Sequence, residues 1–156
     1  MKTAIVTGCA GGIGFATVKK LTAAGIKVLG MDICPSADVT EKFMDFGGCF
    51  KYFSGNLADS ADRKSLLNEA KAFLGRIDIL VNVAGVAPKV RNDILEMTEE
   101  SYDRVMDINA KGTMFLSQII AKDMLSNELC DGIRGYIVNI SSMSAYTSST
   151  SRGEYC

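Results

Sequence analysis

The sequence contains no histidine among its 156 residues. This absence excludes the Ser-His-Asp and Cys-His nucleophile systems, in which an imidazole takes the proton of the nucleophile. It also excludes the commonest zinc sites, which use histidine as a ligand, and we expect no metal site. Any proton transfer must therefore use Tyr, Lys, Asp, Glu or Cys.

Clusters of positive charge and long apolar runs are also missing. The net charge is -1 with no Lys/Arg stripe, so we expect no nucleic-acid partner. No apolar stretch is long enough to span a bilayer. The first residues, MKTAIVTG, reach a glycine too early for a signal peptide. These absences predict a cytoplasmic protein without membrane association.

The cysteines form neither a CxxC pair nor a spacing typical of a metal site. We expect them to be reduced and mostly buried, where they pack as small apolar side chains. They are Cys9, Cys34, Cys49, Cys130 and Cys156. The length, with 47% apolar and 22% charged residues, is typical of one globular domain, which we predict to cover 1–156.

Short apolar runs rich in β-branched residues alternate with longer helical patterns. The runs are Thr3–Val6, Lys27–Met31, Phe50–Phe53, Ile79–Val83 and Tyr136–Ile140. Their nearly continuous apolar character is typical of parallel strands buried on both faces. The helical patterns cover Ile13–Ala24, Ser60–Phe73, Thr98–Ile108 and Lys111–Ser126. Between the second and third strands the segment is short, and we expect only a vestigial helix there.

This alternation predicts an α/β fold with a Rossmann-like, doubly wound parallel sheet and right-handed crossovers. The fifth strand has no helical pattern after it, although a strand that is apolar on both faces needs cover on both. We therefore expect the C-terminal part of the fold to lie beyond residue 156.

A glycine-rich segment, VTGCAGGIGFA, leads from the first strand into the first helix. Its glycines are Gly8, Gly11, Gly12 and Gly14. Glycines at such a junction allow a tight turn and let the backbone approach a diphosphate, which then sits on the free N–H groups of the helix. The alternative is a simple strand-to-helix turn. Because the segment opens a βαβ unit, we favour a dinucleotide site.

Asp32 ends the second strand, about where a carboxylate would meet the adenosine ribose of a dinucleotide. The alternative is a solvated turn carboxylate. A carboxylate there accepts hydrogen bonds from the ribose hydroxyls and repels a 2'-phosphate. No Arg or Lys lies in the CAGG segment to bind such a phosphate. The sequence therefore predicts NAD in preference to NADP as the cofactor.

Several motifs together resemble the short-chain dehydrogenase/reductase family over the whole chain. The family's TGxxxGIG appears as Thr7–Gly14, and its NNAG appears as NVAG at Asn82–Gly85. Its IVNISS appears at Ile137–Ser142. The family's adenine-contacting Asp-Val pair is replaced by Asn-Leu at 56–57.

The resemblance implies roles for individual residues. It implies a catalytic asparagine at Asn109 in DINAKG, which would hold a water, a catalytic serine at Ser142 and a general acid/base at Tyr155. The cofactor-binding residues it implies are Gly8, Gly11, Gly12, Ile13, Gly14, Asp32, Ile33, Asn56, Leu57, Asn82, Ala84 and Gly85.

The lysine of the family's YxxxK motif would fall three positions beyond Cys156. A free phenol has a pKa of about 10, which suits proton transfer at neutral pH poorly, and in the family the lysine supplies the compensating charge. We therefore expect the 156-residue chain by itself to bind NAD weakly and to turn over little substrate.

Three functions follow from the resemblance. The segments 86–109 and 151–156 look most like 3-oxoacyl-acyl-carrier-protein reductases, which would take a carrier-protein thioester and usually prefer NADPH. The Asp32 argument favours instead an NAD-dependent polyol or sugar dehydrogenase. A third reading is a nucleotide-binding module without catalysis. The family usually forms tetramers, so we expect a homo-oligomer of the full-length protein, with Lys111–Ser126 in its interface.

Overall fold

The computed structural model describes residues 1–156, which form alternating strands and helices. The strands are β1 (Thr3–Thr7), β2 (Lys27–Asp32), β3 (Phe50–Ser54), β4 (Ile79–Asn82) and β5 (Tyr136–Asn139). The α-helices are α1 (Gly12–Ala23), α2 (Ser36–Phe43), α3 (Ser60–Leu74), α4 (Glu99–Met106) and α5 (Thr113–Met124). Short helical turns occupy Met44–Cys49, Ile94–Glu96, Met143–Ala145 and Gly153–Tyr155, and a π-helical segment occupies Asp107–Gly112.

The five strands form one parallel sheet in the order β3-β2-β1-β4-β5. The chain first builds outward from β1 to β3 and then crosses back to add β4 on the other side of β1. In the β1–β4 pair Ile5 is opposite Leu80, and both are fully buried. The reversal of strand order between β1 and β4 leaves a crevice at the carboxyl ends of these strands, where ligands bind in doubly wound sheets.

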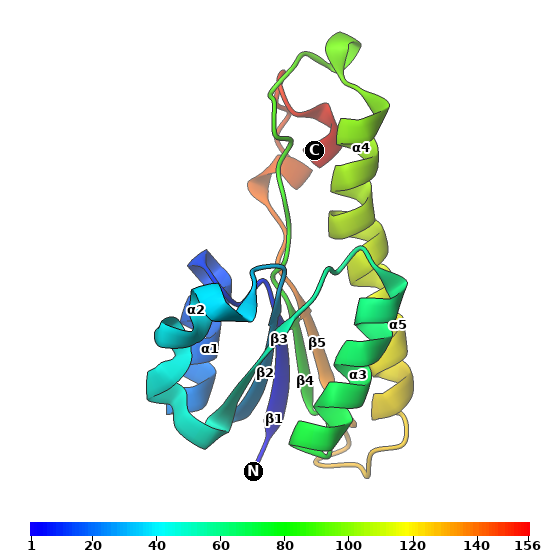
Figure 1. The fold of residues 1–156 in the computed structure, drawn as a ribbon. Coiled ribbons are helices and arrows are strands. Elements are labelled where there is room, and N and C mark those ends of the chain that lie inside the picture. Colours follow the sequence, from blue (N-terminus) through cyan, green and yellow to red (C-terminus); the bar gives the residue numbers. More distant parts are fainter.

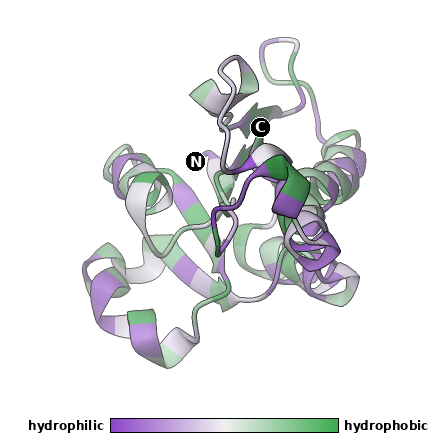
Figure 2. Ribbon diagram, turned by 90° about the horizontal axis from the view of Figure 1, so that it is seen from above, coloured by the Kyte–Doolittle hydropathy of each residue, from purple (hydrophilic) through white to green (hydrophobic).

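Helices cover both faces of the sheet (Figure 1). On one face α3 and α5 pack on a buried cluster that contains Leu29, Leu66, Leu80 and Leu116. On the other face α1 and α2 pack on a second cluster of buried residues, which is bordered by the rings of Phe15, Phe43, Phe46, Phe50 and Tyr52. Figure 2, seen from above the carboxyl ends of the strands, shows the two helical layers on opposite sides of the sheet.

The predicted fold class is confirmed, and the strand boundaries differ from the predicted ones by one residue at the most. Two helical predictions need correction. The helix between β2 and β3 is not vestigial, because α2 has eight residues and buries Val39 and Phe43. The helices predicted to meet near Ala110 form one continuous helical rod, since the π-helical segment Asp107–Gly112 joins α4 to α5.

One expectation about burial is wrong. Only Cys9 is buried, whereas Cys49, Cys130 and Cys156 are exposed, and all five cysteines are free thiols. Strand β5 is exposed throughout, which agrees with the expectation that no helix within these 156 residues covers the fifth strand. None of the helices combines the length and the hydropathy that a membrane span would require.

The central position of Leu80 gives a test of the fold. Because its side chain is 0% exposed between the two helical layers, Leu80→Ala should lower the free energy of unfolding by about 2–5 kcal/mol. Leu95→Ala is the matched control, since Leu95 is 88% exposed and should change stability by less than about 0.5 kcal/mol. Urea denaturation followed by circular dichroism measures both, and equal effects would contradict the position of β4 in the core.

Candidate active site

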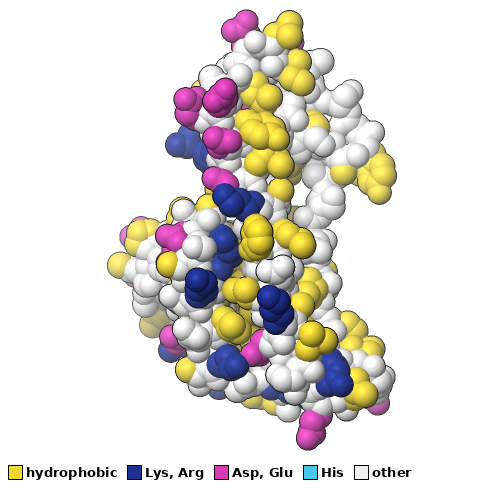
Figure 3. Space-filling view, turned by 90° about the vertical axis from the view of Figure 1, so that its right-hand side faces the viewer, with side chains coloured by type: hydrophobic (Ala, Val, Ile, Leu, Met, Phe, Trp, Pro, Cys, Tyr) yellow, Lys and Arg dark blue, Asp and Glu magenta, His cyan; other side chains and the backbone are white.

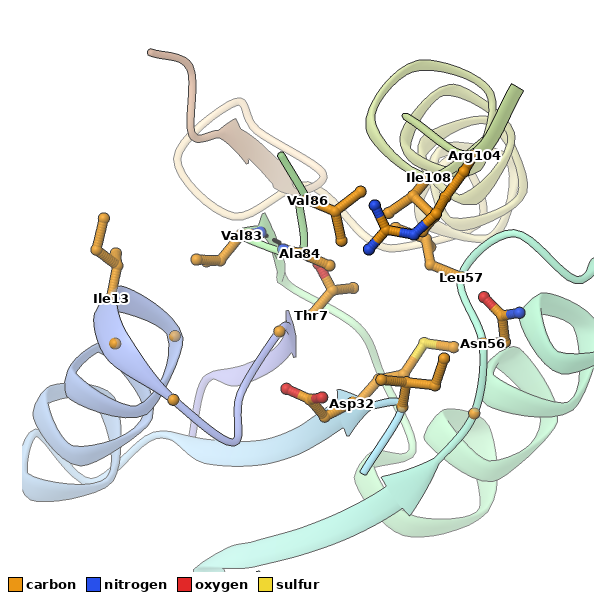
Figure 4. A pocket seen from close by; sticks show the side chains of 18 residues that line it. Thr7, Ile13, Asp32, Asn56, Leu57, Val83, Ala84, Val86, Arg104 and Ile108 are labelled. Atoms are coloured by element: carbon orange, nitrogen blue, oxygen red, sulfur yellow. Dashed lines mark hydrogen bonds between the residues drawn. The ribbon is translucent and has the colours of Figure 1, made fainter. Parts of the chain in front are cut away.

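A cavity of about 610 Å³ lies at the carboxyl ends of β1, β2 and β4 (Figure 4). We call it the glycine-loop cavity. Its lining includes eleven of the twelve residues predicted to bind a cofactor, which are Gly8, Gly11, Gly12, Ile13, Gly14, Asp32, Ile33, Asn56, Leu57, Ala84 and Gly85. Segments far apart in the sequence therefore meet where the strand order reverses.

Two of the glycines are required by close backbone approaches. A Cβ on Gly14 would lie 1.9 Å from the carbonyl oxygen of Gly8, so only glycine lets the first turn of α1 fold against the preceding loop. A Cβ on Gly8, whose φ is +66°, would lie 2.8 Å from the backbone nitrogen of Ala84. In contrast, a Cβ on Gly11 would meet no atom within 4 Å, which shows open space above the loop.

The N-terminus of α1 is free to bind an anion. Its N-cap residue is Gly11, no side chain caps it, and its first turn contains no acidic residue. Helices α3 and α4 are capped by the side chains of Asp59 and Thr98 instead. The first N–H groups of a helix have no partner within the helix. In α1 these groups border the cavity, because the cavity lining includes Gly11, Gly12 and Ile13. This arrangement fits a diphosphate.

Asp32 connects β2 to the glycine loop. Its Oδ2 accepts a hydrogen bond from the Ala10 N–H at 2.9 Å, and its Oδ1 is 3.4 Å from the Cys34 nitrogen. The carboxylate thus retains free acceptor capacity toward the cavity. Lys42 of α2 donates to the Ala10 carbonyl, so a lysine does contact the CAGG segment, although the sequence of that segment contains none. Lys42 does not line the cavity, whereas Asp32 does.

The cysteines near this end of the cavity remain uncharged at neutral pH. Burial, and secondarily the Asp32 carboxylate, raises the pKa of the Cys9 thiol. The same two causes raise the pKa of the Cys34 thiol. Neither cysteine lines the cavity, and Asp32 is the only acidic residue that does.

Asn56 and Leu57, which replace the Asp-Val pair of the family resemblance, have different environments. The Oδ1 atom of Asn56 accepts from the Ala58 N–H at 3.0 Å, and its Nδ2 atom has no protein partner. Leu57 is buried in the core cluster under α3 and α5. Asn56 lines the cavity, and its amide keeps an unused amino group and one remaining lone pair on oxygen.

Thr7 holds the two halves of the cavity together, a role that its position in the glycine motif did not reveal. Its side chain is fully buried, and its Oγ1 accepts from the backbone N–H groups of Val83 and Ala84, both at 3.1 Å. The hydroxyl thus joins the end of β1 to the segment after β4, as Figure 4 shows.

A second cavity, of about 640 Å³, contains the three predicted catalytic residues Asn109, Ser142 and Tyr155. We call it the serine–tyrosine cavity. Ser142 precedes the helical turn Met143–Ala145 and accepts from the Ser144 N–H at 3.2 Å. Tyr155 lies in the last helical turn, Gly153–Tyr155, and is partly buried. The fold therefore brings together residues that are up to 46 positions apart (155 minus 109).

The Asn109 side chain binds the backbone of the segment after β4 through both its oxygen and its nitrogen. Its Oδ1 accepts from the Val86 N–H and its Nδ2 donates to the Val86 carbonyl, both at 2.8 Å. Asn109 belongs to the π-helical segment between α4 and α5, and such segments are frequent at functional sites. Asn109 therefore fixes the loop after β4, whereas its predicted contact with a water stays a prediction.

Asn82 is the predicted cofactor residue that does not reach the glycine-loop cavity. It is 3% exposed at the end of β4 and lines the serine–tyrosine cavity. Its Nδ2 donates to Ser117 Oγ at 2.9 Å and to Asn139 Oδ1 at 2.8 Å, while its own Oδ1 has no partner. Asn82 thus links β4 to α5 and β5 beneath the site.

Two arginines at the cavities were not predicted. Arg104 of α4 approaches the glycine-loop cavity beside Leu57 and Ile108 (Figure 4), and its Nη1 donates to the Ala87 carbonyl at 2.9 Å. Arg104 and Ile108 are four positions apart and so lie on one face of the helix, but neither was predicted, so the sequence held no signal for Arg104. Arg152 lines the serine–tyrosine cavity, three residues before Tyr155.

Comparison with known proteins agrees with this geometry. A sequence model described as short chain dehydrogenase matches residues 2–156. Over 145 residues the chain is 36% identical to 2-dehydro-3-deoxy-D-gluconate 5-dehydrogenase of Escherichia coli, which covers 93% of this chain and 55% of that protein. It is 29% identical to human 3-hydroxyacyl-CoA dehydrogenase type-2, with 97% of this chain and 60% of the relative covered. The chain thus spans little more than half the length of these relatives.

Solved structures share the fold. The crystal structure of a 3-oxoacyl-[acyl-carrier protein] reductase from Brucella melitensis in complex with NAD aligns with a TM-score of 0.88 at 33% sequence identity. The alignment covers 99% of this chain and 61% of the reductase.

The Thr7 hydroxyl provides a test of the cavity wall. Thr7→Val keeps the shape of the side chain but leaves the Val83 and Ala84 N–H groups without their acceptor. We expect the free energy of unfolding to fall by about 1–3 kcal/mol. Amide exchange by NMR should also become faster at these two residues.

Thr40→Val is the control for this change. Thr40 lies on the exposed face of α2, and its hydroxyl donates only to the Ser36 carbonyl of its own helix. It should change stability by less than about 0.5 kcal/mol. Unchanged amide exchange at Val83 and Ala84 in the Thr7→Val variant would contradict the proposed role of the Thr7 hydroxyl in holding these two residues.

Proposed function

The chain belongs to the short-chain dehydrogenase family, and from this premise we propose that the protein is a nicotinamide-dependent oxidoreductase. It interconverts a secondary alcohol and a ketone. The observation that carries the proposal is the shared wall of the two cavities. Ile13 and the segment Val83–Val86 line both the glycine-loop cavity and the serine–tyrosine cavity.

This shared wall suits an elongated cofactor. The amides of the first turn of α1 would hold its diphosphate, and Asp32 would accept hydrogen bonds from the adenosine ribose. The other end of the same molecule would then pass Ala84 and Gly85 into the cavity that contains Ser142 and Tyr155. When bound there, the oxidised nicotinamide ring accepts a hydride at C4.

The protein residues manage the proton that accompanies this hydride. During alcohol oxidation the carbinol C–H bond breaks and its electron pair leaves with the hydride. The O–H proton passes to the deprotonated Tyr155 oxygen, so that a C=O double bond forms. Ser142 donates a hydrogen bond to the substrate oxygen and steadies it. In the reverse direction Tyr155 returns the proton to the oxygen as the carbonyl carbon receives the hydride.

Two substrate classes have support. The solved structures favour a 3-oxoacyl-acyl-carrier-protein reductase-like activity, because they carry that name and share the fold over 99% of this chain. The relative that is 36% identical acts, by its name, on a sugar acid, which favours an NAD-dependent sugar or polyol dehydrogenase. Both reactions interconvert a secondary alcohol and a ketone.

Self-association of the complete protein is part of the proposal. Met114 and Phe115 of α5 are 61% and 44% exposed, and Gln118 and Ile119 follow one turn later. Figure 3 shows hydrophobic side chains on the face that α4 and α5 present. An exposed apolar strip of this kind suits contact between copies of the chain.

Asp32 should determine the choice of cofactor. Asp32→Asn removes the charge that repels a 2'-phosphate, and it should reduce the preference for NADH over NADPH about tenfold, which corresponds to about 1.4 kcal/mol. Titration of cofactor fluorescence measures the two dissociation constants. Asp45→Asn is the control, because Asp45 is exposed and does not line the cavity. Tighter binding of NADPH than NADH by the unaltered protein would contradict the proposed role.

Tyr155 should be required for turnover in the protein as its gene encodes it. Tyr155→Phe removes the hydroxyl that exchanges the proton, so kcat should fall about 10²–10⁴-fold while NADH binding is retained. Tyr146→Phe is the control, since Tyr146 lies in the same segment and is 91% exposed. Steady-state assays with a ketone and NADH measure kcat for the two variants. Activity retained by the Tyr155 variant would contradict the proposed acid/base role of this residue.

A further inference from the structure

The charged lining of the serine–tyrosine cavity is of one sign only. Its lining comprises 17 residues, and Arg152 is the only charged one among them. No aspartate, glutamate or lysine among residues 1–156 lines it. Polar amides and hydroxyls, such as Asn139 and Ser141, supply the rest of its hydrogen-bonding groups. A cavity of one sign attracts ligands of the other sign, and the effect is stronger where the walls exclude water.

Within residues 1–156, Arg152 has no anionic partner. The chain forms four salt bridges, and none of them includes Arg152. The Nε atom of Arg152 is buried and has no hydrogen-bond partner. A buried donor without an acceptor is unfavourable, so an acceptor supplied by a ligand would satisfy a group that residues 1–156 leave unpaired.

The guanidinium is held beside the proposed acid/base. Its Cζ atom lies 5.4 Å from the centroid of the Tyr155 ring, within the range of a cation–π contact. The neighbouring Glu154 forms no salt bridge with it, and the Glu154 carboxylate accepts a hydrogen bond from Ser101 of α4 instead. Arg152 is thus positioned next to the place where a substrate oxygen would meet Tyr155.

We propose that this cavity selects substrates that carry a carboxylate on the same small molecule as the reacting secondary alcohol or ketone, and that Arg152 binds this carboxylate. The inference rests on the proposed function and names its substrate class. Guanidinium groups match carboxylates with two parallel hydrogen bonds, and one cation balances one carboxylate. A neutral polyol or the neutral acyl part of a thioester would leave the guanidinium unpaired.

The carboxylate takes no part in the electron transfer. It keeps its charge through the reaction while the carbinol carbon loses its hydride and the carbinol oxygen loses its proton to Tyr155. Its binding to Arg152 is therefore equally strong in the alcohol and in the ketone. Arg152 acts as a positioning residue whose effect appears mainly in KM.

The test uses pairs of probes that differ only in charge, with the protein as its gene encodes it. The probes are 3-hydroxybutanoate, 4-hydroxypentanoate and 5-hydroxyhexanoate, each compared with its methyl ester, in the presence of NAD or NADP. We expect at least one acid to exceed its ester in kcat/KM by tenfold or more. Arg152→Met should lower kcat/KM for that acid about ten- to a hundredfold through KM, and should change the value for the ester less than about threefold.

Two further variants make the result specific. Arg152→Lys keeps the charge and should recover part of the affinity for the acid. Arg91→Met removes a cation that is exposed and lines neither cavity, so it should leave all the values unchanged. If Arg152→Met does not fold, inhibition of the unaltered protein by butanoate but not by butyramide provides the same comparison.

The outcomes separate the two proposals. Equal turnover of acids and esters would overturn the carboxylate inference and leave the oxidoreductase function standing. An equal loss of kcat for acid and ester in Arg152→Met would overturn it as well, because the arginine would then act through Tyr155. No turnover of any probe or of unrelated secondary alcohols, with either cofactor, would overturn the proposed function and the inference together.

Discussion

The site depends on backbone segments that lie too close for any side chain to separate them. The Gly8 carbonyl leaves no room for a Cβ on Gly14, and the backbone of Ala84 leaves none for a Cβ on Gly8. The end of β1, the start of α1 and the segment after β4 therefore meet as bare backbone. Thr7 secures this contact from below with hydrogen bonds to Val83 and Ala84. Without these contacts the two cavities would not share a wall.

The same segment after β4 is held from the opposite side. Asn109 binds both polar atoms of the Val86 backbone. It can do so because the helical rod widens at Asp107–Gly112 into a π-helical turn. Gly112 in this turn lies so close to Leu57 that a Cβ would come within 2.8 Å of it. The residues that form the wall between the cavities are thus fixed by contacts with β1 below and the α4–α5 rod beside them.

Much of this arrangement follows from local sequence. Continuous apolar runs predicted the parallel strands, and the glycine spacing located the cavity, because both properties depend on neighbouring residues only. The features that sequence did not predict depend on contacts across space. Lys42 reaches the glycine loop from α2, and Arg152 forms no salt bridge with any of residues 1–156. Burial of the cysteines also depends on their distance from the sheet centre, and only Cys9 is next to it.

The charges of the two cavities differ in a way that bears on specificity. The glycine-loop cavity is lined by one carboxylate, Asp32 at the end of β2, and by one arginine, Arg104 of α4. The serine–tyrosine cavity has a single cation and no anion. A carboxylate is useful where sugar hydroxyls must be bound and phosphate refused, and it would repel an acidic substrate if it lay beside Tyr155. A cation beside Tyr155 has the reverse effect. With the proposed cofactor and substrate in place, the separation of these charges along one continuous wall would discriminate against an extra negative charge on the cofactor and in favour of one on the substrate.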